Sequence, residues 1–153
     1  MTEGVWVLIA AVTAVLGFGL WRLATDGRFR GTHAVRGVED EARTGVDDGR
    51  ATLVDVLPPG TRLGERATLL QFSTAFCAPC RATRRTLAEV ADVVSGVEHV
   101  EIDAEHHLEL VRRLAVLRTP TTLVLDARGR EVGRASGAPR KEQVLGALAL
   151  ASP

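Results

Sequence analysis

The sequence predicts an α/β domain with a central mixed sheet flanked by helices, preceded by one N-terminal transmembrane helix. An uncharged apolar run fills residues 4–21, and from residue 51 short apolar segments alternate with amphipathic ones. The only two cysteines form one motif, Cys77-Ala78-Pro79-Cys80, directly after such an apolar segment. The predicted organisation is an N-terminal tail over residues 1–3, a transmembrane helix over 4–23, a charged tether over 24–50 and a single domain over 51–153.

The N-terminal run, GVWVLIAAVTAVLGFGLW, approaches the roughly 20 apolar residues that a helix needs to cross a bilayer. Trp6 and Trp21 stand near its two ends, where amphipathic rings favour the membrane interface. The run has no polar stripe, which argues against a buried helix of a soluble domain. A cleaved signal peptide fits poorly, because only Glu3 is charged ahead of the run and no small-x-small cleavage site follows. We expect a single-pass membrane protein that contacts lipid through residues 4–23.

The flanking charges predict the orientation. No Lys or Arg precedes the run, whereas Arg22, Arg28, Arg30 and Arg36 follow it. The positive-inside tendency therefore places the domain in the cytoplasm. An extracytoplasmic domain is the alternative, since the free amino terminus adds positive charge on the other side. The formal net charge of zero gives no basic footprint, and we expect no nucleic-acid partner.

The first part of the chain after the anchor is rich in charge. Residues 24–50 are rich in Gly, Arg, Asp and Glu and lack sustained periodicity, which is typical of a solvated linker. Part of residues 38–43 is the exception, where we predict a short helix. The apolar run Thr52–Leu57 predicts a strand, stopped by Pro58-Pro59-Gly60. The largely apolar segment Thr68–Phe72 predicts a central buried strand that leads into the cysteine motif.

The rest of the chain continues the alternation of helices and strands. After the motif, apolar residues recur at helical spacing from Thr83 to Val94, with charged residues on the other face. The early strand–helix–strand order implies a parallel pair with a right-handed crossover. The further predicted elements are a strand over Val97–Asp103, a short helix over Leu108–Leu114, a hairpin of Thr121–Asp126 and Glu131–Ser136, and a closing helix over Lys141–Leu150.

The cysteine motif carries the chemistry. At a strand-to-helix junction, the Cys77 sulfur lies beside unsatisfied backbone N–H groups and the positive end of the helix dipole, which lowers the thiol pKa from about 8.5. Pro79 falls in the first turn, where a missing N–H costs little. Cys80 lies one turn further in and is more shielded. We predict that Cys77 attacks a substrate disulfide, that Cys80 resolves the mixed disulfide, and that Arg81 favours the thiolate.

A zinc knuckle is the other use of such a cysteine pair, with His99, His106 and His107 as further ligands. The spacing from Cys80 to these histidines does not fit compact finger patterns. A strand-to-helix junction inside an α/β core does not fit them either. We therefore expect no metal, and we expect His106 and His107 to be exposed near a helix start.

A second signal is Arg118-Thr119-Pro120-Thr121, directly ahead of an apolar strand. A proline that enters a central strand needs an explanation. A cis peptide bond would let the chain turn and leave the preceding backbone free to pair with a ligand. An ordinary trans proline at the end of a loop is the alternative, and it would be favoured if Pro120 stood alone.

The cysteine motif and the Thr-Pro pair, in this order and spacing, resemble the thioredoxin superfamily. The resemblance runs from about Ala51 to Leu150. Its markers are the Leu69–Phe72 strand, the Phe76-Cys77-Ala78-Pro79-Cys80-Arg81 run, the Ile102-Asp103 strand end, Thr119-Pro120-Thr121, the hairpin, and Gly137 ahead of the last helix.

The resemblance implies a thioredoxin-like fold, a cis Pro120 beside the cysteine pair, and redox chemistry that uses the Cys77–Cys80 disulfide and no cofactor. It also implies substrate binding by residues around the motif and the Thr-Pro pair. An N-terminal anchor followed by such a domain resembles membrane-bound proteins of the TlpA and ResA kind. The implied substrate-binding residues are Phe76, Ala78, Pro79, Thr119 and Pro120.

Three positions depart from thioredoxin proper. Phe76 and Ser73 stand where thioredoxin has tryptophans, and Gln71 replaces a buried carboxylate that is thought to take the proton from the resolving cysteine. An amide cannot do so. His99 falls near a family lysine that neighbours this carboxylate, and its imidazole titrates in the useful range. We therefore predict that Gln71, Arg81 and His99 tune the site or transfer protons. The Ala78-Pro79 pair favours a potential nearer about −270 mV than about −120 mV.

These observations predict a membrane-anchored thiol–disulfide oxidoreductase that is mainly a protein-disulfide reductase. Its expected substrates are protein or small-molecule disulfides. Its electrons would come from a thioredoxin reductase or a membrane thiol carrier. One alternative is an outward-facing reductase of the TlpA and ResA kind that acts in cytochrome c maturation. The other is a non-catalytic membrane adaptor with a thioredoxin-like scaffold, which retention of both cysteines disfavours.

Overall fold

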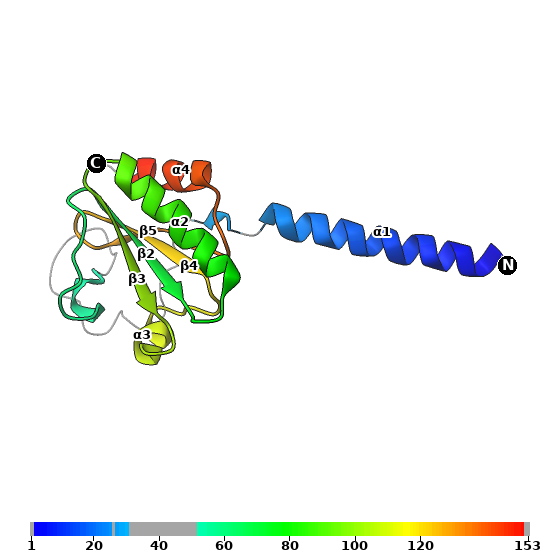
Figure 1. The fold of residues 1–153 in the computed structure, drawn as a ribbon, viewed down its shortest axis with the longest axis horizontal. Coiled ribbons are helices and arrows are strands. Elements are labelled where there is room, and N and C mark those ends of the chain that lie inside the picture. Colours follow the sequence, from blue (N-terminus) through cyan, green and yellow to red (C-terminus); the bar gives the residue numbers. More distant parts are fainter. Residues whose placement is uncertain (1, 26, 31–51, 152–153) are drawn as a thin grey trace.

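A computed structural model describes residues 2–25, 27–30 and 52–151 of the chain. Helix α1 (Thr2–Thr25) projects away from the rest of the chain (Figure 1). Within it, Gly4–Arg22 is long and apolar enough to cross a membrane, and none of its most apolar stretch is buried. Such an exposed apolar surface is unfavourable in water, and it fits a single-pass anchor or a signal sequence. The predicted N-terminal helix is therefore confirmed as a helix.

One mixed sheet of five strands forms the centre of the described domain, in the order β1-β5-β4-β2-β3. The neighbours β2 and β3 run parallel, and the other three pairs are antiparallel. This confirms the predicted parallel pair and the predicted hairpin. The strands are β1 (Phe29–Arg30), β2 (Ala67–Ser73), β3 (Val97–Asp103), β4 (Thr121–Asp126) and β5 (Glu131–Ser136).

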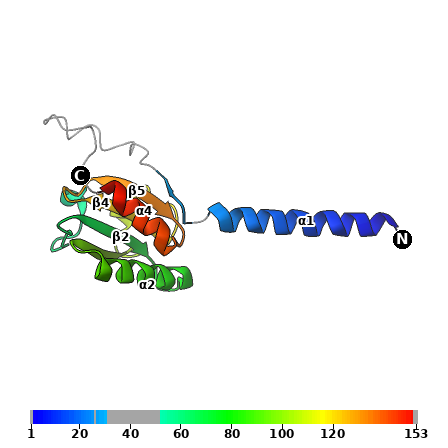
Figure 2. The same ribbon diagram turned by 90° about the horizontal axis from the view of Figure 1, so that it is seen from above.

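Side chains alternate between the two faces of the central strand β2, and each face has its own core. Leu69 packs in the cluster beneath helices α2 (Ala78–Val93) and α4 (Lys141–Ala151). Leu70 and Phe72 pack on the other face, which includes residues of α3 (Leu108–Arg113). Figure 2 shows the layers from above, with α1 leading away from them. The predicted fold class is confirmed.

The predicted strand Thr52–Leu57 is wrong. Thr52 makes only an isolated bridge to Arg130, and the 3-10 helix η1 (Val54–Val56) follows it. A strand would place Asp55 on the same face as Leu53 and Leu57. A helical turn instead buries both leucines in the core and leaves Asp55 exposed. The burial of the two leucines therefore outweighs the preference of this apolar segment for a β-strand.

Part of the predicted tether is ordered against the domain. Phe29 pairs with Ala135 and Arg30 with Arg134, so β1 extends the sheet beside β5. Gly27 has a φ of +70° and its N–H donates to the Ser136 carbonyl over 3.1 Å; a Cβ there would clash with the Ala138 carbonyl oxygen. Glycine is the residue that tolerates this conformation and contact. The predicted short helix over 38–43 lies outside the described residues.

Candidate redox site

The two cysteines lie where β2 passes into α2, as the sequence predicts. Cys77 caps the helix in an extended conformation, and its sulfur accepts the backbone N–H of Cys80 over 3.1 Å. Pro79 occupies the first turn of α2. Cys77 and Cys80 form a disulfide in the structure, with their Cα atoms 5.2 Å apart. An N–H group aimed at the Cys77 sulfur is an arrangement that stabilises a thiolate when the pair is reduced.

The two sulfur-bearing residues differ in exposure. Cys77 retains 9% of its surface and Cys80 only 1%. Ala78 and Pro79, between them, are exposed, and Phe76 ahead of them is fully exposed at 100%. A large substrate can therefore approach from the side of Cys77, while Cys80 lies beneath the surface.

The Thr119-Pro120 peptide bond is cis, so the trans alternative is wrong. Pro120 is buried directly ahead of β4, whose first residue, Thr121, pairs with Phe72 near the end of β2. The Thr119 hydroxyl lies 3.3 Å from the Thr74 hydroxyl, on the segment that leads from β2 to the cysteines. The pairing of β2 with β4 therefore brings the two predicted parts of the site to the same edge of the sheet.

A buried amide connects Cys80 to the sheet. Gln71 is fully buried, and its Nε2 donates to the Cys80 carbonyl over 3.0 Å and to the Ser73 hydroxyl over 2.9 Å. Its Oε1 lies 3.1 Å from Nε2 of His99. Since a carbonyl only accepts, the Cys80 contact fixes the amide orientation, and His99 must donate through Nε2. The Nδ1 atom of neutral His99 then remains as the nitrogen that can accept a proton.

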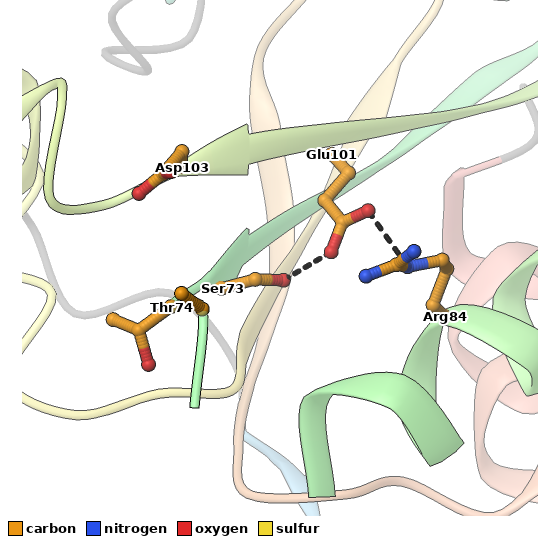
Figure 3. A pocket seen from close by; sticks show the side chains of 6 residues that line it. Ser73, Thr74, Arg84, Glu101 and Asp103 are labelled. Carbon is orange, nitrogen blue, oxygen red and sulfur yellow. Dashed lines mark hydrogen bonds and ion pairs between the residues drawn. The ribbon is translucent and has the colours of Figure 1, made fainter. Parts of the chain in front are cut away.

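The same chain of hydrogen bonds ends at a carboxylate. The Ser73 hydroxyl lies 2.6 Å from one Glu101 oxygen, and Arg84 Nε lies 2.8 Å from the other. Figure 3 shows Glu101 between Ser73 and Arg84, at the edge of a cavity of about 270 Å³. Glu101 and Arg84 were not among the predicted site residues. The signal for Glu101 was the period of two along β3, which places it on the same face as His99.

Burial lowers the pKa of His99 below its usual value of 6.5. The negative charge of Glu101 opposes this shift, and the positive charge of Arg84 adds to it. His99 is therefore held neutral at neutral pH by its surroundings. Because the unfolded chain binds this proton more readily, His99 contributes a loss of stability as the pH falls below 6.5.

The remaining predicted residues lie further from these contacts. Arg81 is in the first turns of α2 with an exposed side chain, and its backbone N–H donates to the Cys77 carbonyl over 3.3 Å. His106 is exposed, and its Nδ1 lies 2.8 Å from the Asp103 carboxylate. His107 precedes α3 and is half-buried, not exposed as predicted, because its Nδ1 lies 3.0 Å from the Asp103 carbonyl oxygen. Within the described residues, no group of three His, Cys, Asp or Glu side chains is arranged to hold a metal.

A sequence model of the thioredoxin-like domain matches residues 61–152. The chain belongs to the thioredoxin-like domain family. Thioredoxin H2 of Arabidopsis thaliana is 31% identical over 74 residues, which are 48% of this chain and 55% of the relative. Thioredoxin H-type 2 of Nicotiana tabacum is 24% identical over 120 residues, which are 78% of this chain and 87% of the relative. The chain thus spans about half the length of the Arabidopsis relative.

Solved thioredoxin structures share the fold of this thioredoxin-like domain. Thioredoxin f from spinach chloroplast has a TM-score of 0.51 and 25% identity, over 57% of this chain and 78% of its own. Thioredoxin from Fasciola hepatica has a TM-score of 0.50 and 24% identity, over 56% and 81%. Proteins of this family use a redox-active disulfide and no cofactor, and the Cys77–Cys80 disulfide stands at that place here.

Proposed function

We propose that this protein is a membrane-anchored thiol–disulfide oxidoreductase that mainly reduces protein disulfides. The observation that carries the proposal is the Cys77–Cys80 disulfide at the start of α2, with the more exposed cysteine at the helix cap. Its relationship to thioredoxins supports the same chemistry. The chain has no other cysteine, so all of its thiol–disulfide chemistry lies in this pair.

The reaction begins with the reduced pair. The Cys77 thiolate attacks one sulfur of a substrate disulfide, forms a mixed disulfide and releases the other substrate sulfur as a thiolate. Cys80 then loses its proton and attacks Cys77, which re-forms the Cys77–Cys80 disulfide and releases the second substrate thiol. Two electrons pass to the substrate. A dithiol donor, such as a thioredoxin reductase or a membrane thiol carrier, restores the reduced pair.

Substrate contacts are proposed for the exposed residues around the cysteines and for the Thr-Pro loop. Phe76, Ala78 and Pro79 present open surface beside Cys77. Thr119 is half-buried at the same sheet edge, and its position ahead of the cis bond leaves its backbone for an extended substrate segment. Arg81 contributes positive charge near the attacking sulfur.

We further propose that residues 4–23 span the membrane and that the domain lies in the cytoplasm. The exposed apolar helix and the arginines that follow it support this arrangement. An anchor followed by a thioredoxin-like domain is also the arrangement of the TlpA and ResA kind, which supports an outward-facing reductase as the second candidate. The two differ in electron supply, because an outward domain needs electrons delivered across the membrane.

The test of the reductase is insulin-disulfide reduction by the full-length protein in detergent, with dithiothreitol as the donor. We expect insulin to precipitate faster with the protein than with the same chain in which both cysteines are serine. Equal rates for the two chains would rule out the proposed reductase activity and favour a non-catalytic adaptor.

His99 is proposed to receive the proton that Cys80 releases, at Nδ1 and through water. We expect the His99 imidazole to titrate below pH 6.5 when followed by NMR in the oxidised protein. Glu101→Gln should lower this midpoint further and Arg84→Gln should raise it, because the two charges act in opposite directions. We also expect His99→Ala to change the pH profile of insulin reduction. An unchanged rate and profile would rule His99 out as the acceptor.

A further inference from the structure

The connection between α1 and the domain is short, and it is fixed to the sheet. From Trp21, at the end of the apolar run, α1 continues to Thr25, a rise of about 6 Å. Two more residues reach Gly27, which adds at most about 7 Å. The Gly27 N–H is bonded to the Ser136 carbonyl, and β1 follows at once. Chain length alone therefore holds the Ser136 end of β5 close to the boundary of the apolar span, whatever the tilt of α1.

This end of the sheet is also the end that carries the redox site. Ser136 pairs with Thr121, the residue after Pro120, and Gly137 N–H donates to the Pro120 carbonyl over 2.8 Å. The Arg118 side chain also donates to the Ser136 carbonyl. Figures 1 and 2 both show the N-terminal end of α2 on the side of the domain from which α1 leads away. The cysteine pair and the anchor therefore share one side of the domain.

Two large apolar side chains are exposed in the segments that carry the site. Phe76, directly before Cys77, is 100% exposed, and Leu117, three residues before Pro120, is 94% exposed. They are the two most exposed large apolar residues that the structure describes outside α1. Exposed Arg22 and Arg28 flank the connection to the anchor, and basic side chains there suit a surface of lipid headgroups. Phe76 adjoins Cys77 in the chain, and Leu117 precedes the Thr119-Pro120 loop at the same end of the sheet.

We propose that this redox site works at the membrane surface, on disulfides in the juxtamembrane segments of integral membrane proteins. The proposal rests on the proposed anchor and reductase chemistry. A bulky soluble substrate would meet the bilayer as it approached Cys77, whereas a segment that leaves the membrane nearby arrives beside it. The apolar side chains of such a segment suit the exposed Phe76 and Leu117. The reaction on this substrate is the same two-electron exchange, with the reduced pair as the reductant.

The test uses the pre-reduced full-length protein in vesicles of phosphatidylcholine and phosphatidylglycerol, with the donor removed, so that each molecule reduces one disulfide. Two transmembrane peptides carry the same disulfide loop, either next to the membrane or beyond a long flexible spacer. A third copy of the loop is free in solution. Because both anchored loops share the vesicle, their comparison separates position from local concentration. We expect the near loop to be reduced at least about tenfold faster than the spaced loop.

Two matched insertions test whether the short connection between α1 and the domain causes the preference for the near loop. About twelve Gly and Ser residues between Thr25 and Gly27 add a root-mean-square span of about 20 Å between membrane and domain. This insertion should remove the preference for the near loop and leave reduction of the free loop unchanged. The same insertion between Gly45 and Val46, after β1, should change neither rate.

The outcomes separate this inference from the reductase itself. Equal rates on the near and spaced loops, or equal effects of the two insertions, would overturn the membrane-surface site while reduction of the free loop upheld the reductase. Failure to reduce any of the three loops, with the same result for Cys77→Ser, would overturn both. If alkaline carbonate released the protein from the vesicles, α1 would not span the membrane. The proposed anchor and the proposed membrane-surface site would then both be wrong.

Discussion

Replacing Cys77 with serine is expected to abolish insulin-disulfide reduction, whereas replacing Cys80 with serine is expected to stop the reaction one step later, at a mixed disulfide. Cys77 is the more exposed of the pair, and its sulfur accepts the Cys80 N–H at the start of α2. Serine cannot form the mixed disulfide, so turnover should fall to the rate of the double-cysteine variant. Cys80 is almost completely buried, and its only role in the proposed reaction is to attack Cys77.

Mass spectrometry after mixing each reduced variant with oxidised insulin checks both results. Cys80→Ser should carry one insulin chain through Cys77 and release it on addition of dithiothreitol. Cys77→Ser should carry none. Arg85→Gln serves as a control, because it keeps both cysteines and changes only an exposed charge further along α2. Trapping at Cys80 in Cys77→Ser, and none in Cys80→Ser, would reverse the assigned roles.

The sequence predicts most of the sheet because apolar runs and turn residues there agree with the tertiary structure. Val97–Asp103, Thr121–Asp126 and Glu131–Ser136 have the predicted bounds. The Thr52–Leu57 segment differs because its β-type composition conflicts with an acidic residue on the face that two leucines bury. Local composition carries little information about which face the core selects.

The short strand β1 could not be predicted for a related reason. Its two residues lie in a charged region, and the strand exists because Phe29 packs against the α4-side cluster and Gly27 fits against Ala138. Both contacts join residues that are far apart in the sequence, 111 positions for Gly27 and Ala138. Such long-range contacts leave no local periodicity in the sequence. A segment that packs against the domain therefore has the same sequence pattern as a solvated linker.

Within the site, the cysteines and Pro120 could be predicted because their residue types are tied to one chemistry. Gln71 and His99 were found through a resemblance, and the structure brings their side chains together. Glu101 and Arg84 are common surface residue types. Their role depends on which face of β3 packs against which face of α2. The carboxylate at the end of the hydrogen-bond chain could therefore be identified only from the three-dimensional structure.

Replacing Gln71 with leucine is expected to lower the free energy of unfolding by about 2–4 kcal/mol, because it removes hydrogen bonds to buried or partly buried partners. The amide lies at zero exposure and joins Cys80, Ser73 and His99. Leucine fills a similar volume, so the loss reports on polar contacts more than on packing. Cys80 also loses the side chain that holds its backbone. We expect the mixed disulfide to persist longer in this variant during insulin reduction.

The matched control for Gln71 is its neighbour Thr122, which faces it across the β2–β4 pair. Thr122 is equally buried, but its hydroxyl has no hydrogen-bond partner in the described part of the structure. Thr122→Val should therefore leave stability unchanged or raise it. Urea denaturation in detergent, followed by circular dichroism, measures both variants, since Trp6 and Trp21 lie in α1 and do not report on the domain. If Gln71→Leu were as stable as Thr122→Val, the amide would contribute no more to the fold than an unpaired hydroxyl, and its proposed hold on Cys80 would fail.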